Sequence, residues 1–318
     1  MKRQLLGVAA ILLSISTYAQ DNPLWMRYCA ISPDGTTIAF TYKGDIYTVP
    51  STGGRASQIT TNPAHDTKPI WSPDGKKIAF ASDRMGSMDI FEVNKEGGIP
   101  KRLTTHSGNE TPVAYKDAGH ILFLANIMPT AEDAQFPSGQ FQQVYEVNTE
   151  GGRPILFSSM PMEDISINHT GNTLLYHDKK GYEDPWRKHH TSSITRDIWL
   201  CSLNGNRTFR KQTAFNGEDR TPVWASDDKS FYYLSEEKGS FNIFKRDIDG
   251  NTSKQITNHT KHPVRFLSAA SNGTLCYGYD GEIYTVKEGA IPQKVQISIV
   301  TDKNDKDLIR QIKRSGAT

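Results

Sequence analysis

Apolar residues in this chain come in short runs, separated by turn-forming Gly, Asp, Pro and Ser residues. The clearest stretch begins at Pro69 and reads P-I-W-S-P-D-G-K-K-I-A-F-A-S-D, then D-I-F-E-V, then G-G-I-P-K-R-L-T ending at Thr104. It shows none of the sustained 3.6-residue apolar periodicity that a helix requires. Its regularly placed turn-forming residues are typical of strands joined by tight turns. We therefore expect short β-strands throughout this stretch.

The same phrase recurs six times, so it encodes a unit that buries its apolar face only by stacking on copies of itself. Its first turn falls at Gly35, Gly75, Gly119, Gly171, Asp228 and Gly273. Four short antiparallel strands in each repeat of about 40–45 residues are the signature of a propeller blade. The sequence predicts an all-β fold over residues 20–299: a six-bladed β-propeller of four-stranded antiparallel blades.

Within each copy, the position of a strand follows from its residues. Ile78-Ala79-Phe80 lacks polar alternation, as expected for a second strand buried on both faces. The third strand opens with an acid or amide before an aliphatic-aromatic pair, as in Asp89-Ile90-Phe91. Because Asp45, Asp89 and Asp197 recur in register, we expect them to bond neighbouring backbone. Each copy contains all four strands, so the ring should close by side-chain packing between blades one and six, without strand exchange, although residues 295–299 could pair in more than one way.

The first 19 residues have the pattern of a secretory signal peptide. Lys2 and Arg3 precede an apolar run from Leu5 to Ile15, and a cleavage site, Thr17-Tyr18-Ala19, follows this run. We expect cleavage after Ala19. No other segment approaches the length of a membrane span. The chain is therefore expected in the periplasm and is not expected to be an integral membrane protein.

The charge balance, the cysteines and the absence of known catalytic motifs argue against several classes of function. Without residues 1–19 the chain has 35 basic and 35 acidic residues, and this balance argues against nucleic-acid binding, which needs a basic face. Cys29, Cys201 and Cys276 are scattered and odd in number, so we interpret them as small buried residues and not as a disulfide framework. We find no G-x-S-x-G elbow and no Gly-rich loop before a helix, so no catalytic residue and no cofactor is predicted.

Two insertions interrupt the repeat between its second and third strands, at residues 126–142 and 178–196. Loops on a rigid scaffold commonly carry function. The second insertion contains the candidate peptide-binding residues Trp186, Arg187, Lys188, His189 and His190. Cationic groups beside an indole suit an anionic group such as a peptide carboxylate. The alternative is a solvated loop whose tryptophan packs on a neighbouring blade. No metal is predicted, because the two histidines lack further ligands at suitable spacing.

The repeated phrase, with W-S-P-D-G-K followed by I-A-F, D-I-F, G-G and L-T, resembles the TolB-type propeller repeat. TolB, the tricorn proteases and some prolyl-oligopeptidase relatives share this repeat. The second insertion is more specific: its run from Trp186 to His190, leading through Arg196 to Asp197-Ile198-Trp199, is similar to the tricorn pattern. The six blades match the first propeller of that family, although the insertion at 126–142 lacks the arginines that the family leads us to expect.

This resemblance implies a non-catalytic propeller of an exported tricorn-like serine peptidase, which guides peptide substrate or product through its channel. Arg187 and Lys188 are then candidates for contacts with peptide termini. Residues 300–318 are interpreted as a connector toward a downstream domain. The implied partners are peptides, the downstream peptidase domains of the same polypeptide and, through the full-length protein, further copies of itself.

Two other classes of function stay open at this point. The chain could be a stand-alone TolB-like periplasmic module that binds protein partners on one face. It could also be a propeller enzyme, such as a sugar lyase with a histidine and metal site on one rim, and this class requires a bound metal.

Overall fold

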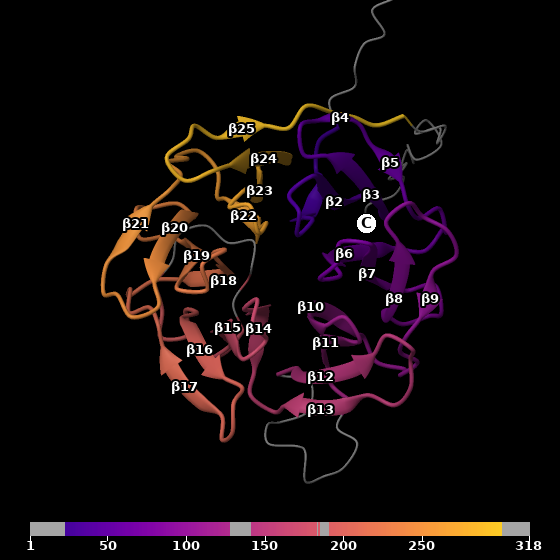
Figure 1. Ribbon diagram of the computed structural model, residues 1–318, viewed down its shortest axis with the longest axis horizontal. Coiled ribbons are helices and arrows are strands. Elements are labelled where there is room, and N and C mark those ends of the chain that lie inside the picture. Colours follow the sequence, from indigo (N-terminus) through magenta and orange to yellow (C-terminus); the bar gives the residue numbers. More distant parts are fainter. Residues whose placement is uncertain (1–22, 128–140, 183, 185–190, 301–318) are drawn as a thin grey trace, which may run out of the picture.

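Six four-stranded antiparallel sheets stand around a common axis in the computed structural model, as the blades of a propeller (Figure 1). The structure describes residues 23–127, 141–182, 184 and 191–300. Each blade takes strands that follow one another along the chain, apart from the short β4. The predicted fold class is confirmed.

The strands of the first three blades are as follows. Blade one contains β1 (Arg27–Ile31), β2 (Thr37–Tyr42), β3 (Asp45–Pro50) and β5 (Ser57–Gln58), with β4 (Gly54–Arg55) beside it. Blade two contains β6 (Asp66–Trp71), β7 (Lys77–Ser82), β8 (Asp89–Asn94) and β9 (Lys101–Arg102). Blade three contains β10 (Thr111–Asp117), β11 (His120–Ala125), β12 (Gln143–Asn148) and β13 (Ile155–Ser158).

The strands of the other three blades follow the same order. Blade four contains β14 (Met162–Ile167), β15 (Thr173–Asp178), β16 (Ile198–Ser202) and β17 (Thr208–Lys211). Blade five contains β18 (Asp219–Trp224), β19 (Ser230–Ser235), β20 (Asn242–Asp247) and β21 (Ser253–Gln255). Blade six contains β22 (Arg265–Ala269), β23 (Leu275–Tyr279), β24 (Glu282–Val286) and β25 (Gln293–Lys294), and β26 (Ile297–Ser298) follows it.

The core lies between the blades, where the second strands are buried on both faces. Ile38 and Phe40 of β2 and Ile78 and Phe80 of β7 are all fully buried. Phe40 packs toward blade six, whereas Ile78 and Phe80 pack against residues of blade one. Burying one such side chain stabilises the fold by about 1.5–3 kcal/mol. The repeat therefore folds as a ring because each blade supplies one wall of its neighbour's core.

The turn after each first strand follows the chemistry of its residues. Asp34 accepts a hydrogen bond from the Ser32 hydroxyl at 2.5 Å and another from the Thr36 backbone N–H at 3.0 Å. Gly35 takes the positive φ of 76° that such a turn needs. In blade five Asp228 occupies this position at φ 51°, which an aspartate tolerates better than most residues.

Two further residues of the repeat hold strands together. The Trp71 indole donates to the Ala30 carbonyl of the preceding blade at 2.9 Å. The Trp224 indole donates in the same way to the Ser166 carbonyl of the preceding blade at 3.0 Å. The threonine that ends the phrase accepts the backbone N–H at the start of a third strand in four blades, from the pairs Thr60–Ile46, Thr104–Ile90, Thr213–Ile198 and Thr257–Ile243. The residues that recur in each copy of the phrase therefore serve mainly to hold strands and blades together.

The recurring acids of the third strands face the outermost strand of their own blade. Asp89 forms an ion pair with Arg102 at 2.8 Å, and Asp197 forms one with Lys211 at 2.9 Å. Asp45 accepts a hydrogen bond from the Gln58 amide at 3.1 Å. These contacts are to side chains, where the sequence suggested backbone partners, because the buried end of the third strand lies beside side chains of the fourth.

The ring closes mainly by packing between blades one and six, as expected. One apolar cluster contains Cys29 and Phe40 of blade one with Cys276 and Ile283 of blade six. No four-stranded blade in the described ranges exchanges a strand. The structure adds one short ladder: β26 pairs in parallel with β4, and this settles the pairing that the sequence left open for residues 295–299. Both cysteines and Cys201 are buried and free, as the sequence indicated.

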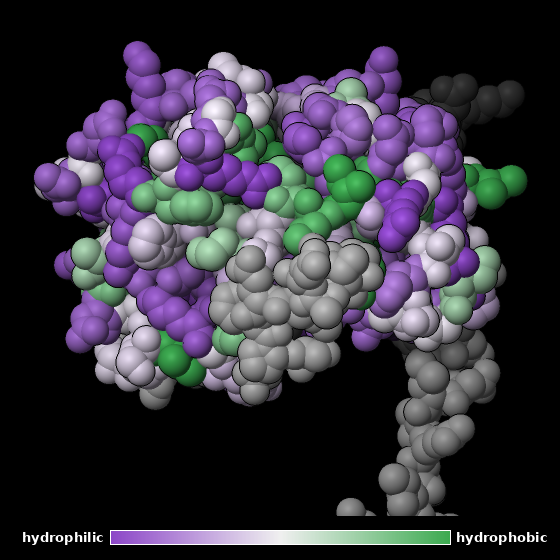
Figure 2. Space-filling view, turned by 90° about the horizontal axis from the view of Figure 1, so that it is seen from below, coloured by the Kyte–Doolittle hydropathy of each residue, from purple (hydrophilic) through white to green (hydrophobic). Residues whose placement is uncertain are grey.

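Hydrophilic residues cover most of the side of the ring seen in Figure 2, with hydrophobic residues gathered near the middle of that view. Exposed apolar residues on the outer part of blade three include Ile155, 61% exposed, and Met160, 42% exposed. Among the described residues, the fold contains no helix that is long and apolar enough to span a membrane.

The closing ladder generates a stability prediction at Gly53. A Cβ added there would lie 2.6 Å from the Gln296 carbonyl oxygen, at φ +92°. Gly97 has almost the same φ, +93°, but its nearest neighbour would be at 3.6 Å. Gly53→Ala should therefore lower the free energy of unfolding by about 1–3 kcal/mol more than Gly97→Ala, measured by urea denaturation. Equal losses would show that the seam does not constrain this position.

Candidate functional site

A cavity of about 560 Å³ lies inside the ring, lined by residues of the first strand of every blade. These are β1, β6, β10, β14, β18 and β22, which come from all parts of the chain (Figure 1). Each first strand contributes a short run of residues, such as Lys68, Pro69 and Ile70 of β6. The centre of the propeller is therefore a composite site that no single blade could form.

Each inner strand carries a β-bulge, which inserts one extra residue and changes where a side chain points. The register shifts within β1, β6, β10, β14, β18 and β22. The bulge residues that line the cavity in five blades have positive φ values of 48–57°: Tyr28, Lys68, Asp164, Thr221 and Phe266. In blade three the same position is Pro112, whose ring excludes positive φ. Non-glycine residues in this conformation are uncommon and concentrate at functional sites.

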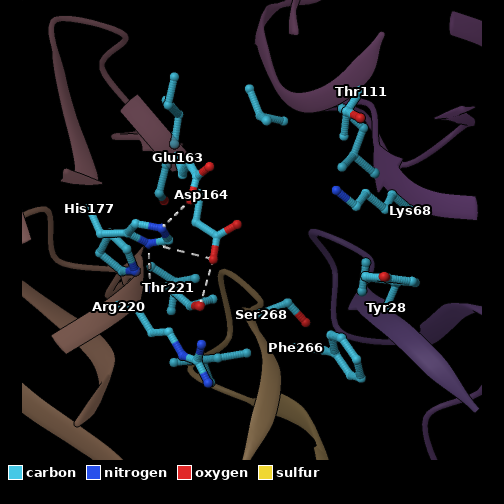
Figure 3. Close-up of a pocket in the computed structure, with 18 of the residues that line it drawn as sticks. Tyr28, Lys68, Thr111, Glu163, Asp164, His177, Arg220, Thr221, Phe266 and Ser268 are labelled. Atoms are coloured by element: carbon cyan, nitrogen blue, oxygen red, sulfur yellow. Dashed lines mark hydrogen bonds and ion pairs between the residues drawn. The ribbon is translucent and has the colours of Figure 1, made fainter. Parts of the chain in front are cut away.

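Blades four and five form a polar wall around His177, whose side chain is only 4% exposed. His177 Nδ1 accepts the backbone N–H of Thr221 at 3.2 Å. Because Nδ1 is an acceptor, Nε2 carries the proton, and it donates to Glu163 Oε2 at 3.3 Å. The Thr221 hydroxyl donates to Asp164 Oδ2 at 2.6 Å (Figure 3). The histidine thus links the two blades and orders the wall.

Glu163 also binds cations. Lys179 Nζ donates to its Oε1 at 2.7 Å, and Arg196 Nε lies 3.5 Å from its Oε2. Burial alone would raise the pKa of Glu163, but the hydrogen bond from His177 and the Lys179 ammonium group hold it well below its ordinary value. Arg196 reaches Glu218 as well, at 2.8 Å. Glu163 is therefore ionised, and the positive charges of Lys179 and Arg196 balance its negative charge.

Arg220 lies beside this network on β18. Its Nη1 is 3.5 Å from Glu218 Oε1, and its guanidinium stacks over the Phe241 ring at 4.1 Å. Burial lowers the pKa of Arg220 to about 10, although the Glu218 carboxylate opposes the shift. Arg220 is thus still cationic at neutral pH, and Glu218 balances part of its charge.

The opposite wall, from blades six, one and two, is aromatic and cationic. The rings of Tyr28 and Phe266 meet at 4.8 Å, and Lys68 Nζ lies 5.8 Å from the centre of the Tyr28 ring. Figure 3 shows Lys68 pointing into the cavity from the side opposite Asp164. Burial lowers the pKa of Arg265, and the Asp184 carboxylate opposes the shift. The two walls therefore differ in charge and in polarity.

The described lining residues include five cations and two carboxylates: Lys68, Lys179, Arg196, Arg220 and Arg265 against Glu163 and Asp164. Such a surplus attracts anionic groups into a site that partly excludes water. Within the described ranges, no group of three or more His, Cys, Asp or Glu side chains is placed to hold a metal ion. The arrangement provides charged and aromatic contacts suited to binding.

The predicted site residues Trp186, Arg187, Lys188, His189 and His190 lie outside the described residues, so their contacts stay a prediction. The insertion that contains them does border the cavity, because Lys179, Tyr182 and Arg196 are among its lining residues. Gln142, at the end of the insertion of blade three, lines it too.

Sequence reasoning missed the inner-strand residues of the cavity, above all Tyr28, Lys68, Asp164 and His177. A signal for them exists when the six copies are compared with one another. The bulge position carries a different residue type in every copy, whereas positions nearby repeat. Because the bulge residue differs from copy to copy, it can determine which ligand the cavity binds.

Comparison with known proteins identifies a family for this chain. Residues 23–290 match the model of the tricorn protease N-terminal β-propeller domain. The chain is 25% identical over 281 residues to Tricorn protease homolog 1 of Streptomyces coelicolor, covering 87% of this chain and 25% of that protein. It is 27% identical over 295 residues to the Tricorn protease homolog of Saccharolobus solfataricus, covering 88% and 26%. The chain thus spans about a quarter of the length of these relatives.

A solved structure agrees at the level of the fold. The crystal structure of the tricorn protease superposes with a TM-score of 0.73 at 21% identity, covering 89% of this chain and 27% of that one.

The ionised Glu163 generates a pH-dependent prediction. Glu163→Gln should lower the free energy of unfolding at pH 7 by about 2 kcal/mol, because the neutral amide keeps only one acceptor oxygen for His177 and Lys179 and loses the negative charge that faces them. A carboxyl whose folded pKa is depressed stabilises the fold above its unfolded pKa, about 4.5. The difference between parent and variant should therefore shrink as the pH falls below this value.

Urea denaturation at pH 7 and pH 4 measures this effect. Glu288→Gln is the control, because Glu288 also accepts from two side chains, here Lys245 and Lys254, but on the outer surface. It should cost less than about 1 kcal/mol. A loss for Glu163→Gln no larger than that of the control would contradict the assigned network.

Proposed function

The chain belongs to the tricorn protease N-terminal β-propeller family, and from this membership we propose that it is a non-catalytic propeller that binds and guides peptides for a tricorn-like serine peptidase. The observation that carries the proposal is the cavity lined by the inner strands of all six blades. Its volume, about 560 Å³, lies within the range of small-ligand sites, about 300–1,000 Å³. A site of this size accommodates a short peptide or one segment of a longer one.

The charge of the lining supports a peptide ligand. Five cationic side chains face two carboxylates among the described lining residues. A peptide with a free C-terminus carries an anionic group that this surplus attracts. The aromatic pair Tyr28 and Phe266 supplies an apolar surface for a peptide side chain.

The peptide-bond hydrolysis belongs, in this proposal, to parts of the protein other than these residues. The relatives that carry the name protease are about four times as long as the matched segment. The proposed site of action is the periplasm, to which the signal peptide expected at residues 1–19 would direct the chain.

The expected effect of Arg187 and Lys188 is on the rate of association. Charges at the rim of a site steer a ligand and change its on-rate more than its off-rate. In the variant with Arg187→Ala and Lys188→Ala, a free-acid peptide should associate several-fold more slowly, with a nearly unchanged off-rate. The melting temperature should barely change, since surface substitutions shift stability by only about 0.5 kcal/mol. Stopped-flow fluorescence at low salt measures both rates, and an unchanged on-rate would remove these residues from the proposal.

Photo-crosslinking tests the proposed location of the peptide. A short peptide with a central benzophenylalanine is irradiated with the purified chain, and the labelled residues are mapped by mass spectrometry. The label should lie on the first strands of the blades and fall when unlabelled peptide is added in excess. Label confined to the outer strands, or label that excess peptide does not reduce, would contradict peptide binding in the cavity.

A further inference from the structure

Among the described residues, each wall of the cavity presents one charged side chain that forms no ion pair with an oppositely charged lysine, arginine or carboxylate: Asp164 on one wall and Lys68 on the other. We infer that the cavity recognises a peptide by both of its free ends, with the ammonium group at Asp164 and the carboxylate at Lys68. The inference rests on the proposed function and deepens it, because it selects zwitterionic peptides over peptides with blocked ends.

Asp164 is an anion without a strong cationic partner. Its Oδ2 accepts from the Thr221 hydroxyl at 2.6 Å, and its side chain is 47% exposed. His177 Nδ1 lies 3.7 Å away but accepts the Thr221 N–H, so it carries no proton to give. In the described part of the chain, Asp164 forms no ion pair with a lysine or an arginine. A carboxylate accepts several hydrogen bonds, so Asp164 retains acceptor capacity for an ammonium group.

Lys68 is the matching cation on the other side. Its described contact is with the face of the Tyr28 ring, at 5.8 Å, and among the described residues no carboxylate forms an ion pair with it. Its ammonium group points into the cavity toward the wall that carries Asp164 (Figure 3). Lys68 can therefore bind a carboxylate without breaking an existing ion pair.

The other charges of the lining are already engaged. Lys179 and Arg196 bind Glu163, and Arg220 lies near Glu218. Arg265 is influenced by the Asp184 carboxylate. A ligand carboxylate that used these groups would have to compete with the carboxylates that they already face, whereas Lys68 and Asp164 offer their charges directly.

The backbone gives a second, independent reason to choose this pair. Lys68 and Asp164 are both bulge residues, with φ values of 54° and 48°. Such backbone is strained and persists where the surrounding structure imposes it, typically at functional sites. Tyr28 and Phe266 are bulge residues as well, and their rings form the wall next to Lys68. The same strained position in the blades therefore supplies the cation, the carboxylate and the apolar contact of the proposed site.

The test uses one tripeptide, Ala-Leu-Ala, in four forms: free, N-acetylated, C-amidated and blocked at both ends. Their dissociation constants for the purified chain are measured by isothermal titration calorimetry. Blocking either end should weaken binding about tenfold, the loss of one charged hydrogen-bonded contact. In Asp164→Asn acetylation should no longer matter while amidation still does, and in Lys68→Gln the reverse should hold.

Two surface variants are the controls. Asp249→Asn and Lys101→Gln remove exposed charges of the outer surface, and both should behave as the parent chain. The four peptide forms on the parent chain test the inference even if a variant fails to fold.

The outcomes separate the two proposals. Binding of all four forms with equal affinity overturns recognition of the ends and leaves peptide binding standing. Binding of no form overturns both. Blocking effects that are unchanged in the two variants overturn the assignment to Lys68 and Asp164.

Discussion

The structure depends on the closure of the ring between blades one and six. Every blade has two apolar faces, and each interior blade buries both against its neighbours. The first and last blades bury theirs only if the chain returns on itself, which the shared cluster around Cys29 and Cys276 and the parallel ladder at Gly54 achieve. Closure also creates the site, because the six inner strands surround one cavity only in a closed ring.

The site forms where the first strands of the six blades meet around the axis of the ring. The first strands crowd around the axis, and a bulge in each of them turns one side chain toward the cavity. Because the bulge side chain borders the cavity, packing constrains it less than the residues that lie between the blades. The copies can then differ there in charge and size, from Lys68 to Asp164 to Phe266, without disturbing the fold.

The fold could be predicted from the sequence because local and global signals agree. The S-P-D-G turns, the apolar second strands and the period of the phrase all point to four-stranded blades, and Ser32, Asp34 and Gly35 act as their chemistry suggests. The short ladder at Ile297 was not predictable, because a two-residue strand carries no pattern of its own. The partners of Asp45, Asp89 and Asp197 also depend on which side chains the fourth strand places nearby.

The site was less predictable for a physical reason. Tyr28, Lys68, Thr221 and Phe266 are poor formers of positive φ, so nothing local marks them as bulge residues, and only the assembled ring imposes that conformation. His177 joins Glu163 of its own blade to Thr221 of the next blade, and no local pattern around His177 indicates either contact. The ends of the insertion at residues 178–196 border the cavity, but nothing in the sequence of the insertion indicates the charged pair inside the ring.

A crystal structure of the chain with a bromophenylalanine-containing tripeptide would show whether the closed ring holds a peptide along its axis. We predict one anomalous bromine peak inside the ring beside Tyr28 and Phe266, with the peptide ends near Asp164 and Lys68. A peak only on the outer strands, or an empty cavity at saturating peptide, would contradict it.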